Sequence, residues 1–341
     1  MITRYLAWLS AMLMGLSLPT QAVVILQYHH VSTTTPSSTS VTPEQFQTQM
    51  HYLRDHGFNV VPLSVALNAI DQAEPLPPRS VAITFDDGFV SVATHAHPIL
   101  KALNYPYTVF VNVAPIEAKH PIVMDWPTLR RLAHEGATIA NHSYAHHHLI
   151  QRLPNETSAQ WRHRIQQDIE TTAVRIQQET GHQLKALAYP YGEYNRALQA
   201  LLQELGYWGL GQHSGAAGPY SERTAIPRFS ISGDYAELDS LTVKLHSLHM
   251  PVQAIDGADP ELIGRPRPSL TITLDGKDVR TDQLMCYIQG QGAKAPHWLT
   301  EHTFVIQADR PLAAGPSRYN CTAPSRTHSG YYWFSQPWFT S

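Results

Sequence analysis

Short apolar segments of strand length alternate with amphipathic segments over about the first 250 residues of the chain. Expected strands lie at 23–28, 60–61, 81–85, 107–113, 137–140, 184–189, 207–211 and 225–229. Between them apolar residues recur at helical spacing, as at Phe46, Met50 and Leu53, and the longest such stretch covers 155–180. Helical segments between strands are typical of a parallel sheet or barrel, so the pattern predicts an α/β fold.

The pattern changes near residue 250. Residues 251–269 are rich in proline, and we expect a linker there. Short strands then follow at 270–274, 284–289, 303–307 and 331–334, with glycine in the turns between them. The sequence therefore predicts an α/β domain at 23–250 and a small, β-sandwich-like domain at 270–341.

The N-terminus has the features of an export signal. Arg4 precedes an apolar run, residues 5–18, that is too short to span a bilayer comfortably, and Thr20 and Ala22 form a typical signal-peptidase site. We expect a signal peptide at 1–22, cleavage near Ala22, and a periplasmic or secreted protein. An uncleaved membrane anchor is the alternative. No second apolar stretch of spanning length follows, so we expect no transmembrane segment in the mature chain.

Composition narrows the range of partners. The chain has 24 Lys and Arg against 27 Asp and Glu, a formal net charge of -3, which gives no basic surface for nucleic acid. Its 20 histidines suit metal chemistry, although most are expected to be ordinary surface residues. Cys286 and Cys321 are expected to form a disulfide, because an even pair in an exported chain is usually oxidised. The sequence leaves the oligomeric state open.

Two adjacent carboxylates, Asp86 and Asp87, end the expected strand at 81–85. Such neighbours repel each other and are costly to bury unless a positive charge lies close to them. Gly88 allows the backbone to turn sharply and approach a ligand. On these three residues alone, a solvated turn is an equally good interpretation. A functional site is favoured by a second motif, residues 141–146, which follows another expected strand.

His142 and His146 in that motif are four residues apart and can face the same way. With one aspartate they form a two-histidine, one-carboxylate set that binds a divalent metal and leaves positions open for water and substrate. The other aspartate is then placed to act as a general base. One alternative is a polar surface loop, since the histidine run continues to 148. Another is an iron oxygenase, whose ligand set gives no reason for Asp86 beside Asp87.

Three motifs occur in a distinctive order: TFDDG at 84–88, HSYAH at 142–146 and YPYG at 189–192. Together they resemble the polysaccharide deacetylase family, the NodB-homology or carbohydrate esterase 4 group, over about residues 23–248. The resemblance implies a distorted (β/α) barrel. It also implies metal-dependent hydrolysis of N-acetyl groups on a polysaccharide that contains N-acetylglucosamine, with release of acetate.

The same resemblance implies roles for particular residues. Asp86 corresponds to the general base, and the backbone N–H of Tyr191 corresponds to the group that stabilises the oxyanion. The implied ligands of a divalent metal, expected to be Zn²⁺, are Asp87, His142 and His146.

Two positions depart from the family pattern. Ala188 stands where the family usually has an arginine that holds the base, and Arg228 is the candidate replacement from another strand. The usual Leu-x-x-His source of the general acid is matched only loosely, at His246. The segment LQYH, which ends at His29, resembles the poly-N-acetylglucosamine deacetylases, whose barrel is circularly permuted. That resemblance implies His29 as the acid; a structural histidine at a strand end is the alternative.

Aromatic residues near the motifs are candidates for contacts with the substrate. Trp126, Tyr144 and Tyr191 can stack on sugar rings, with a place in the core as the alternative for each, and Pro190 and Arg228 are expected beside the substrate. The C-terminal aromatic residues suit a domain core better than a sugar-binding platform; they are Trp298, Tyr331, Trp333 and Trp338. The polymer itself stays open among poly-β-1,6-N-acetylglucosamine, peptidoglycan and chitin oligomers. The alternative function is an exported, non-catalytic carbohydrate- or metal-binding protein that retains the fold.

Overall fold

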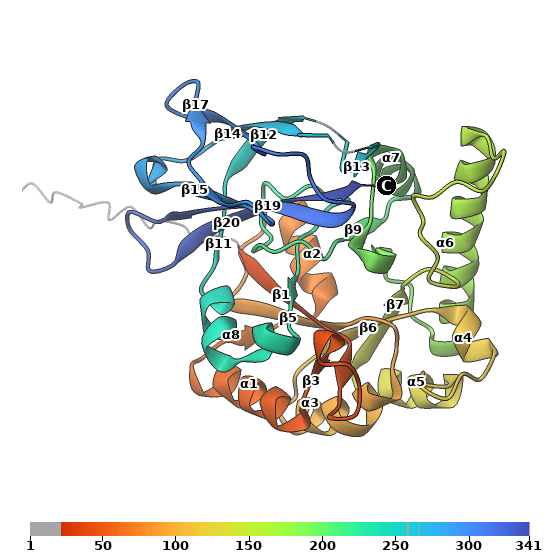
Figure 1. The fold of residues 1–341 in the computed structure, drawn as a ribbon. Helices are drawn as coiled ribbons and strands as arrows, with labels where there is room; N and C mark the ends of the chain where they lie inside the picture. Colours follow the sequence, from red (N-terminus) through yellow and green to blue (C-terminus); the bar gives the residue numbers. More distant parts are fainter. Residues whose placement is uncertain (1–21, 258, 265, 341) are drawn as a thin grey trace, which may run out of the picture.

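A parallel sheet and the helices around it form the larger part of the molecule (Figure 1). The computed structural model describes residues 22–257, 259–264 and 266–340, so the expected signal peptide lies outside the described residues apart from Ala22. Among these residues the sheet has eight strands in the order β10-β1-β5-β6-β7-β8-β9, with β4 also on β5. The strands are β1 (Val23–Tyr28), β4 (Asn59–Val60), β5 (Ser80–Phe85), β6 (Tyr107–Val111), β7 (Ala137–Asn141), β8 (Ala186–Ala188), β9 (Trp208–Leu210) and β10 (Phe229–Ser230).

The segment 226–230 joins the two ends of this sheet. Ile226 bridges in parallel to Leu210 of β9, and Phe229 pairs with Leu26 of β1. The sheet therefore closes into a barrel with an irregular strand order, as the resemblance implied. Because the strands are parallel, their C-terminal ends meet on one face, where α/β barrels collect functional side chains.

Helices connect the strands and cover the outside of the barrel (Figure 1). They are α1 (Pro43–Asp55), α2 (Leu63–Gln72), α3 (His97–Ala102), α4 (Val113–Glu117), α5 (Trp126–His134), α6 (Ser158–Thr180), α7 (Arg196–Leu205) and α8 (Leu238–Leu245). Single turns of 3-10 helix lie at Ser37–Thr39, Pro190–Gly192, Gly233–Ala236 and Thr281–Gln283, and a π-helical turn lies at Val92–Ala96. A short parallel pair, β2 (His30–Val31) and β3 (Ser40–Val41), lies next to the first helix in the chain.

Local sequence explains where these helices begin and end. Thr42 accepts a hydrogen bond from the N–H of Gln45, whose side chain accepts one from the N–H of Thr42, so α1 begins with a capping box. Its apolar residues at helical spacing are buried against the barrel. The longest helix, α6, ends at Gly181, which has a φ of 78° and supplies the left-handed residue that ends many helices.

The C-terminal part is built from antiparallel sheets and a few parallel edge pairings, with a core of its own. One sheet has the order β11-β20-β19-β15-β16, with β13 on β20; the other has the order β12-β14-β18-β17. The strands are β11 (Leu248–His249), β12 (Val252–Gly257), β13 (Glu261–Leu262), β14 (Ser269–Leu274), β15 (Met285–Ile288), β16 (Gly292–Lys294), β17 (His297–Trp298), β18 (Thr303–Gln307), β19 (Gly315–Pro324) and β20 (Tyr331–Thr340). The strand-rich domain expected after the barrel is therefore present.

Two sequence expectations can be compared directly with this part of the molecule. Cys286 and Cys321 form the expected disulfide between neighbouring strands β15 and β19. Residues 251–269, expected as a linker, contain the strands β12 and β13, which pair with β14 and β20. Apolar residues are too sparse there to mark strands, and the pairing partners come from distant parts of the chain.

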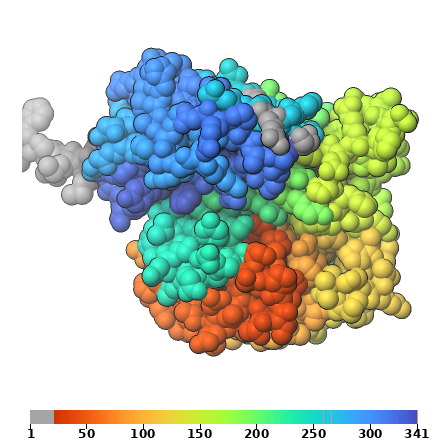
Figure 2. All heavy atoms as spheres, viewed as in Figure 1, coloured from red at the N-terminus to blue at the C-terminus, as the bar shows by residue number. Residues whose placement is uncertain are grey.

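The C-terminal sheets rest directly on the barrel, as the space-filling view shows (Figure 2). Trp333 of β20 packs edge-on against Phe229 of β10, with ring centroids 5.3 Å apart. Trp338 is fully buried in the C-terminal core, as the core interpretation expected, whereas Tyr331 is exposed and so does not fit that interpretation. Across the residues that the structure describes, no helix is both long and apolar enough to cross a membrane.

Candidate active site

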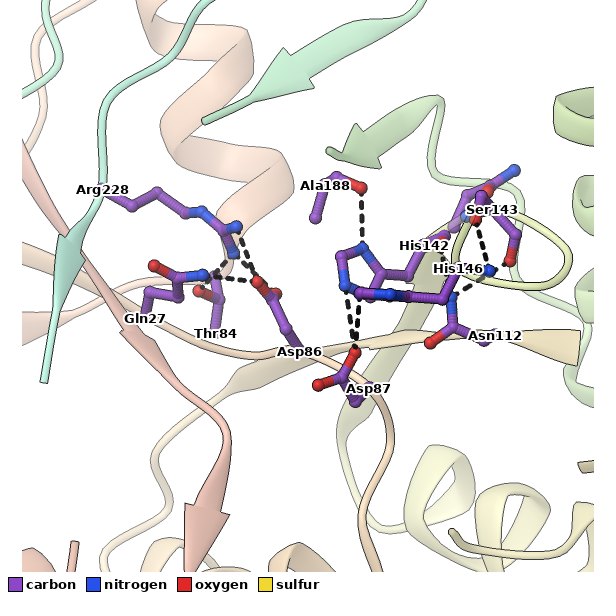
Figure 3. A network of polar contacts seen from close by, with 11 residues as sticks. Gln27, Thr84, Asp86, Asp87, Asn112, His142, Ser143, His146, Ala188 and Arg228 are labelled. Atoms are coloured by element: carbon purple, nitrogen blue, oxygen red, sulfur yellow. Dashed lines mark hydrogen bonds and ion pairs between the residues drawn. The ribbon is translucent and has the colours of Figure 1, made fainter. Parts of the chain in front are cut away.

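Asp86 lies directly after β5 and is completely buried. Its two carboxylate oxygens accept hydrogen bonds from the two terminal nitrogens of Arg228, each at 2.8 Å (Figure 3). Gln27 of β1 donates a third hydrogen bond, 2.6 Å long, to Oδ2. Arg228 thus makes the contact with Asp86 that an arginine at position 188 was expected to make, and it comes from the segment that closes the barrel.

Arg228 is itself held in place. It is as buried as Asp86, and its Nε donates to the carbonyl oxygen of Gly211. Burial alone would raise the pKa of Asp86, but the positive charge and hydrogen bonds of Arg228, with His142 and His29 nearby, hold that pKa far below its usual value. Asp86 is therefore ionised and held in one orientation.

Asp87, His142 and His146 form a compact cluster beside Asp86 (Figure 3). Oδ1 of Asp87 lies 3.2 Å from Nε2 of His142 and 3.3 Å from Nε2 of His146. Each residue offers one ligand atom, and the three atoms lie within 4.8 Å of one another. Two ligands of a tetrahedral ion with bonds of about 2.0–2.1 Å are about 3.3 Å apart, so the two aspartate–histidine separations suit such an ion.

The surroundings of His142 support the same interpretation. Its Nδ1 is bonded at 2.7 Å to the carbonyl oxygen of Ala188, which leaves Nε2 free to act as a ligand. That Nε2 is buried and makes no well-formed hydrogen bond, although Oδ1 of Asp87 lies 3.2 Å away. A metal ion between the two atoms would satisfy both of them.

The backbone bends unusually around these ligands. Asp87, Ser143 and His146 have φ values of 68°, 68° and 56°, a left-handed conformation that non-glycine residues seldom adopt. Gly88 follows at 67°, and a Cβ there would lie 3.0 Å from Cγ1 of Val111. Backbone strain of this kind persists where the surrounding structure imposes it, commonly at functional sites.

His29, one of the two candidate acids, follows the last residue of β1. Burial lowers its pKa, and the nearby charges of Asp86 and Asp87 act in the opposite direction, so His29 lies within electrostatic range of both carboxylates. Its neighbour His30 instead stacks on Phe89, with ring centroids 3.6 Å apart. His246, the other candidate, is next to Phe58, and the charged neighbours that affect its pKa are Arg79 and His56. Of the two candidate acids, His29 and not His246 therefore lies near the carboxylates, and His30 lies within electrostatic range of Asp87 alone.

Pro190 and Tyr191 lie on the turn after β8. Tyr191 has a φ of 59°, and its side chain is 46% exposed. Its ring stacks on His148 at 4.0 Å between centroids and meets His146 edge-on at 4.5 Å. The ring of Tyr191 thus lies beside a candidate metal ligand, and Pro190 is buried.

Tyr144 and Trp126, two of the aromatic residues expected at the sugar, contact other parts of the protein. The hydroxyl of Tyr144 donates to Glu117, and its backbone N–H donates to Asp168. Trp126 begins α5, packs against the barrel core, and is covered by the guanidinium of Arg175, 5.6 Å from the centroid of its ring. Packing between helices therefore accounts for Trp126.

Two contacts of the site were missed in the sequence. Gln27 bridges Asp86 and the hydroxyl of Ser230, which donates to Oε1 of Gln27. His148 is hydrogen-bonded to Glu193 at 2.7 Å, which fixes the ring on which Tyr191 stacks. Gln27 had a detectable signal, because a polar residue inside the apolar segment VVILQY must find a partner when it is buried.

Comparisons with known proteins agree with this geometry. Residues 73–210 match a family model described as polysaccharide deacetylase. A poly-β-1,6-N-acetyl-D-glucosamine N-deacetylase of Staphylococcus aureus strain MRSA252 is 26% identical over 203 residues, 58% of this chain and 70% of that protein. The protein of the same name from Escherichia coli K12 is 25% identical over 252 residues, which cover 63% of this chain but only 37% of its own length.

The solved structure of the Streptococcus pyogenes deacetylase PplD, in complex with acetate, has the same fold. It superposes with a TM-score of 0.59 at 21% identity, covering 66% of this chain and 99% of that chain. Residues 73–210 thus match the polysaccharide deacetylase family that the motifs resemble, and the fold agrees with that match. His29 and Arg228 lie outside the matched residues 73–210.

Proposed function

We propose that this protein removes N-acetyl groups from a polysaccharide that contains N-acetylglucosamine, in a metal-dependent reaction. One observation carries the proposal. A buried, ionised Asp86, held by Arg228 and Gln27, lies beside Asp87, His142 and His146, whose ligand atoms lie within 4.8 Å of one another. The S. aureus and E. coli relatives, named for this reaction on poly-β-1,6-N-acetyl-D-glucosamine, support the same substrate class.

Asp87, His142 and His146 would hold the metal, which we propose to be Zn²⁺ because it favours histidine nitrogen and carboxylate oxygen in a tetrahedral arrangement. When bound, such an ion lowers the pKa of a coordinated water to about 7 and polarises a carbonyl. Two histidines and one carboxylate leave room for both water and substrate.

The chain's own residues divide the proton transfers. Asp86 accepts a proton from the attacking water, since its carboxylate is ionised and held in one orientation. The backbone N–H of Tyr191 donates to the oxygen that becomes negative as the acetyl carbon is attacked. His29 gives a proton to the nitrogen as the C–N bond breaks. The acetyl group leaves as acetate, and the sugar keeps a free amine.

The non-catalytic alternative rested on the missing arginine at Ala188. Arg228 meets that concern, because its guanidinium makes the paired contact with Asp86 from another strand. We therefore favour the enzyme.

We further propose that residues 1–22 direct export and that the enzyme acts in the periplasm or outside the cell. In this proposal residues 23–250 are catalytic and 270–341 belong to the additional β-rich domain, while 251–269 connect the two and add the strands β12 and β13 to its sheets. The relative named for deacetylation of poly-β-1,6-N-acetyl-D-glucosamine supports this location.

The test is acetate release by the zinc-loaded chain from residue 23 on β-1,6-linked N-acetylglucosamine oligomers, chitin oligomers and peptidoglycan fragments. We expect release from at least one class, its loss in Asp86→Asn, and a reduction in His29→Ala. Asp234→Asn, at an exposed aspartate on a 3-10 turn, is the matched control and should retain full activity. Absence of release from all three classes by a chain shown to bind zinc would contradict the proposal.

A further inference from the structure

A cleft of about 570 Å³ lies where the barrel meets the C-terminal sheets. Its walls come from the loop 213–222, the start of α7, the strands β11 and β12, and β20. This volume falls within the range of about 300–1,000 Å³ that is common for small-molecule sites, which often lie between domains.

The cleft is separate from the candidate active site. Pro227 lines it, whereas the side chain of the next residue, Arg228, reaches into the barrel to Asp86. The loop that lines the cleft also pairs through Ala217 with Val23, at the beginning of β1, while Asp86 bonds to Tyr28 at its end. A strand of six residues spans about 17 Å between its ends, so the cleft and the site lie apart.

Aromatic rings and uncharged polar groups dominate the lining. Tyr220 stands at the rim with 42% of its surface exposed, and Trp333 and Phe334 of β20 are partly exposed. Gln253 of β12 is exposed, and Ser214 lies on the loop. Flat apolar faces next to amide and hydroxyl groups match the two kinds of surface on a pyranose ring.

The position of Tyr220 is fixed by His249 of β11. The backbone N–H of Tyr220 donates to Nε2 of His249, whose Nδ1 is bonded to the carbonyl oxygen of Ala216. Burial lowers the pKa of His249 to about 4, so this ring stays neutral and retains both bonds at neutral pH. Gly218 allows the approach, because a Cβ there would lie 2.6 Å from Cδ2 of His249. The rim is thus built in advance of any ligand.

Charge in the cleft favours a neutral or weakly cationic ligand. The guanidinium of Arg196 donates a hydrogen bond to the carbonyl oxygen of Gly257, and its backbone begins α7. Glu222 is exposed; its Oε1 accepts from Thr224, and no ion pair to it is found among the described residues. A carboxylate at this place would attract the amine that deacetylation leaves on a glucosamine unit and would disfavour an anionic ligand.

We propose that this cleft binds a segment of the partly deacetylated aminosugar polymer, away from the site of hydrolysis. Tyr220 supplies a stacking surface, Gln253 a hydrogen-bonding amide, and Glu222 a partner for free amines. The proposal rests on the proposed function for the identity of the polymer. Its consequence is that a long chain can be retained between successive hydrolytic events.

The first test measures binding directly, independent of turnover. The zinc-free chain carrying Asp86→Asn is titrated calorimetrically with a long, partly deacetylated β-1,6-linked glucosamine oligomer and with its fully acetylated form. We expect the double substitution Tyr220→Ala and Gln253→Ala to weaken binding about tenfold. Glu222→Gln should remove any preference for the partly deacetylated oligomer. Tyr287→Ala, at a 48% exposed tyrosine outside the cleft, is the matched control and should bind normally.

The second test uses acetate release with wild-type Asp86. The cleft substitutions should raise KM for long oligomers and leave kcat on a short oligomer unchanged. Equal affinity of the cleft variants and the parent for the long oligomer would overturn the proposal, as would binding of a peptide in preference to glycan. If no oligomer releases acetate but the cleft variants still lose affinity, the proposed function fails while the cleft proposal stands.

Discussion

At the scale of single residues, the protonation state of Asp86 depends on two side chains that come from distant parts of the chain. Arg228 and Gln27 contact it from the segment that closes the barrel and from β1, and neither lies in the TFDDG motif. A general base that is fully buried must have its charge compensated, or it would become protonated instead. The environment of Asp86 therefore determines its protonation state, and each donor can be tested separately.

Gln27→Leu tests the smaller of these contributions. Removing a hydrogen bond to the charged carboxylate raises the pKa of Asp86, so a smaller fraction of enzyme carries the ionised base at low pH. We expect the acidic limb of the kcat/KM profile to move to higher pH, which rate measurements across pH would detect. The matched control is Gln49→Leu, at another buried glutamine that instead bonds to Tyr28 and Ala236. Similar shifts in both variants would contradict a specific role for Gln27.

Arg228→Met tests the larger contribution, because it leaves a fully buried carboxylate without its cation. Removing one partner of a buried ion pair commonly costs about 3–5 kcal/mol, so we expect a large fall in the free energy of unfolding in urea. Adding Asp86→Asn should restore much of that stability without restoring activity. If the double variant is as unstable as Arg228→Met alone, the loss arises from packing of the long side chain, and not from the unpaired charge.

The same pair has a defined pH dependence. The pKa of Asp86 is lower in the folded chain than in the unfolded chain, so the pair stabilises the fold fully above the unfolded value of about 3.9. This contribution is lost as the pH falls from there toward the folded pKa. Over that range of pH, the free energy of unfolding should therefore fall less for Arg228→Met than for the parent.

At the scale of secondary-structure elements, the turn after β5 aims the two aspartates in different directions. The carboxylate of Asp86 points into the barrel and contacts Arg228, whereas the carboxylate of Asp87 points toward His142 and His146 (Figure 3). The left-handed conformations at Asp87 and Gly88 make this divergence possible over two residues. In the proposed mechanism, this turn therefore places the base and a metal ligand on adjacent residues.

Gly88→Ala should disturb that turn. A Cβ at a φ of 67° is strained, and it would also lie 3.0 Å from Cγ1 of Val111. We expect weaker zinc binding and lower kcat/KM than in the parent, measured by competition with a chelating dye and by acetate release. Gly57→Ala is the matched control, since Gly57 has a φ of 68° but no atom within 4 Å of the added Cβ. Loss of zinc affinity in both variants would point to general backbone strain and contradict a local effect.

At the scale of the whole molecule, the sequence predicts whatever depends on local pattern. Alternating strands and helices are sufficient for a parallel sheet or barrel, and the resemblance to the family implied the barrel. Two motifs after strand ends are sufficient to predict the cluster of Asp86, Asp87, His142 and His146. Arg228 could be proposed because an expected arginine was missing at Ala188. Gln27 and His148 were missed, since their partners are far apart in sequence. The strands at 252–257 and 261–262 were missed because their pairing depends on β14 and β20, which follow much later.

Metal binding should link the site to the stability of the entire barrel, because its ligands come from β5 and from the segment after β7. An ion that binds only the folded chain stabilises it by about 2.7 kcal/mol at a hundredfold excess over Kd. We expect zinc to raise the Tm of the mature chain, a chelator to reverse the rise, and His142→Ala to abolish it. His213→Ala, at another buried histidine outside the cluster, should lower the starting Tm but retain the zinc-dependent rise. An equal rise in His142→Ala would show that zinc stabilises the protein from a different place, and would remove the cluster from the proposed mechanism.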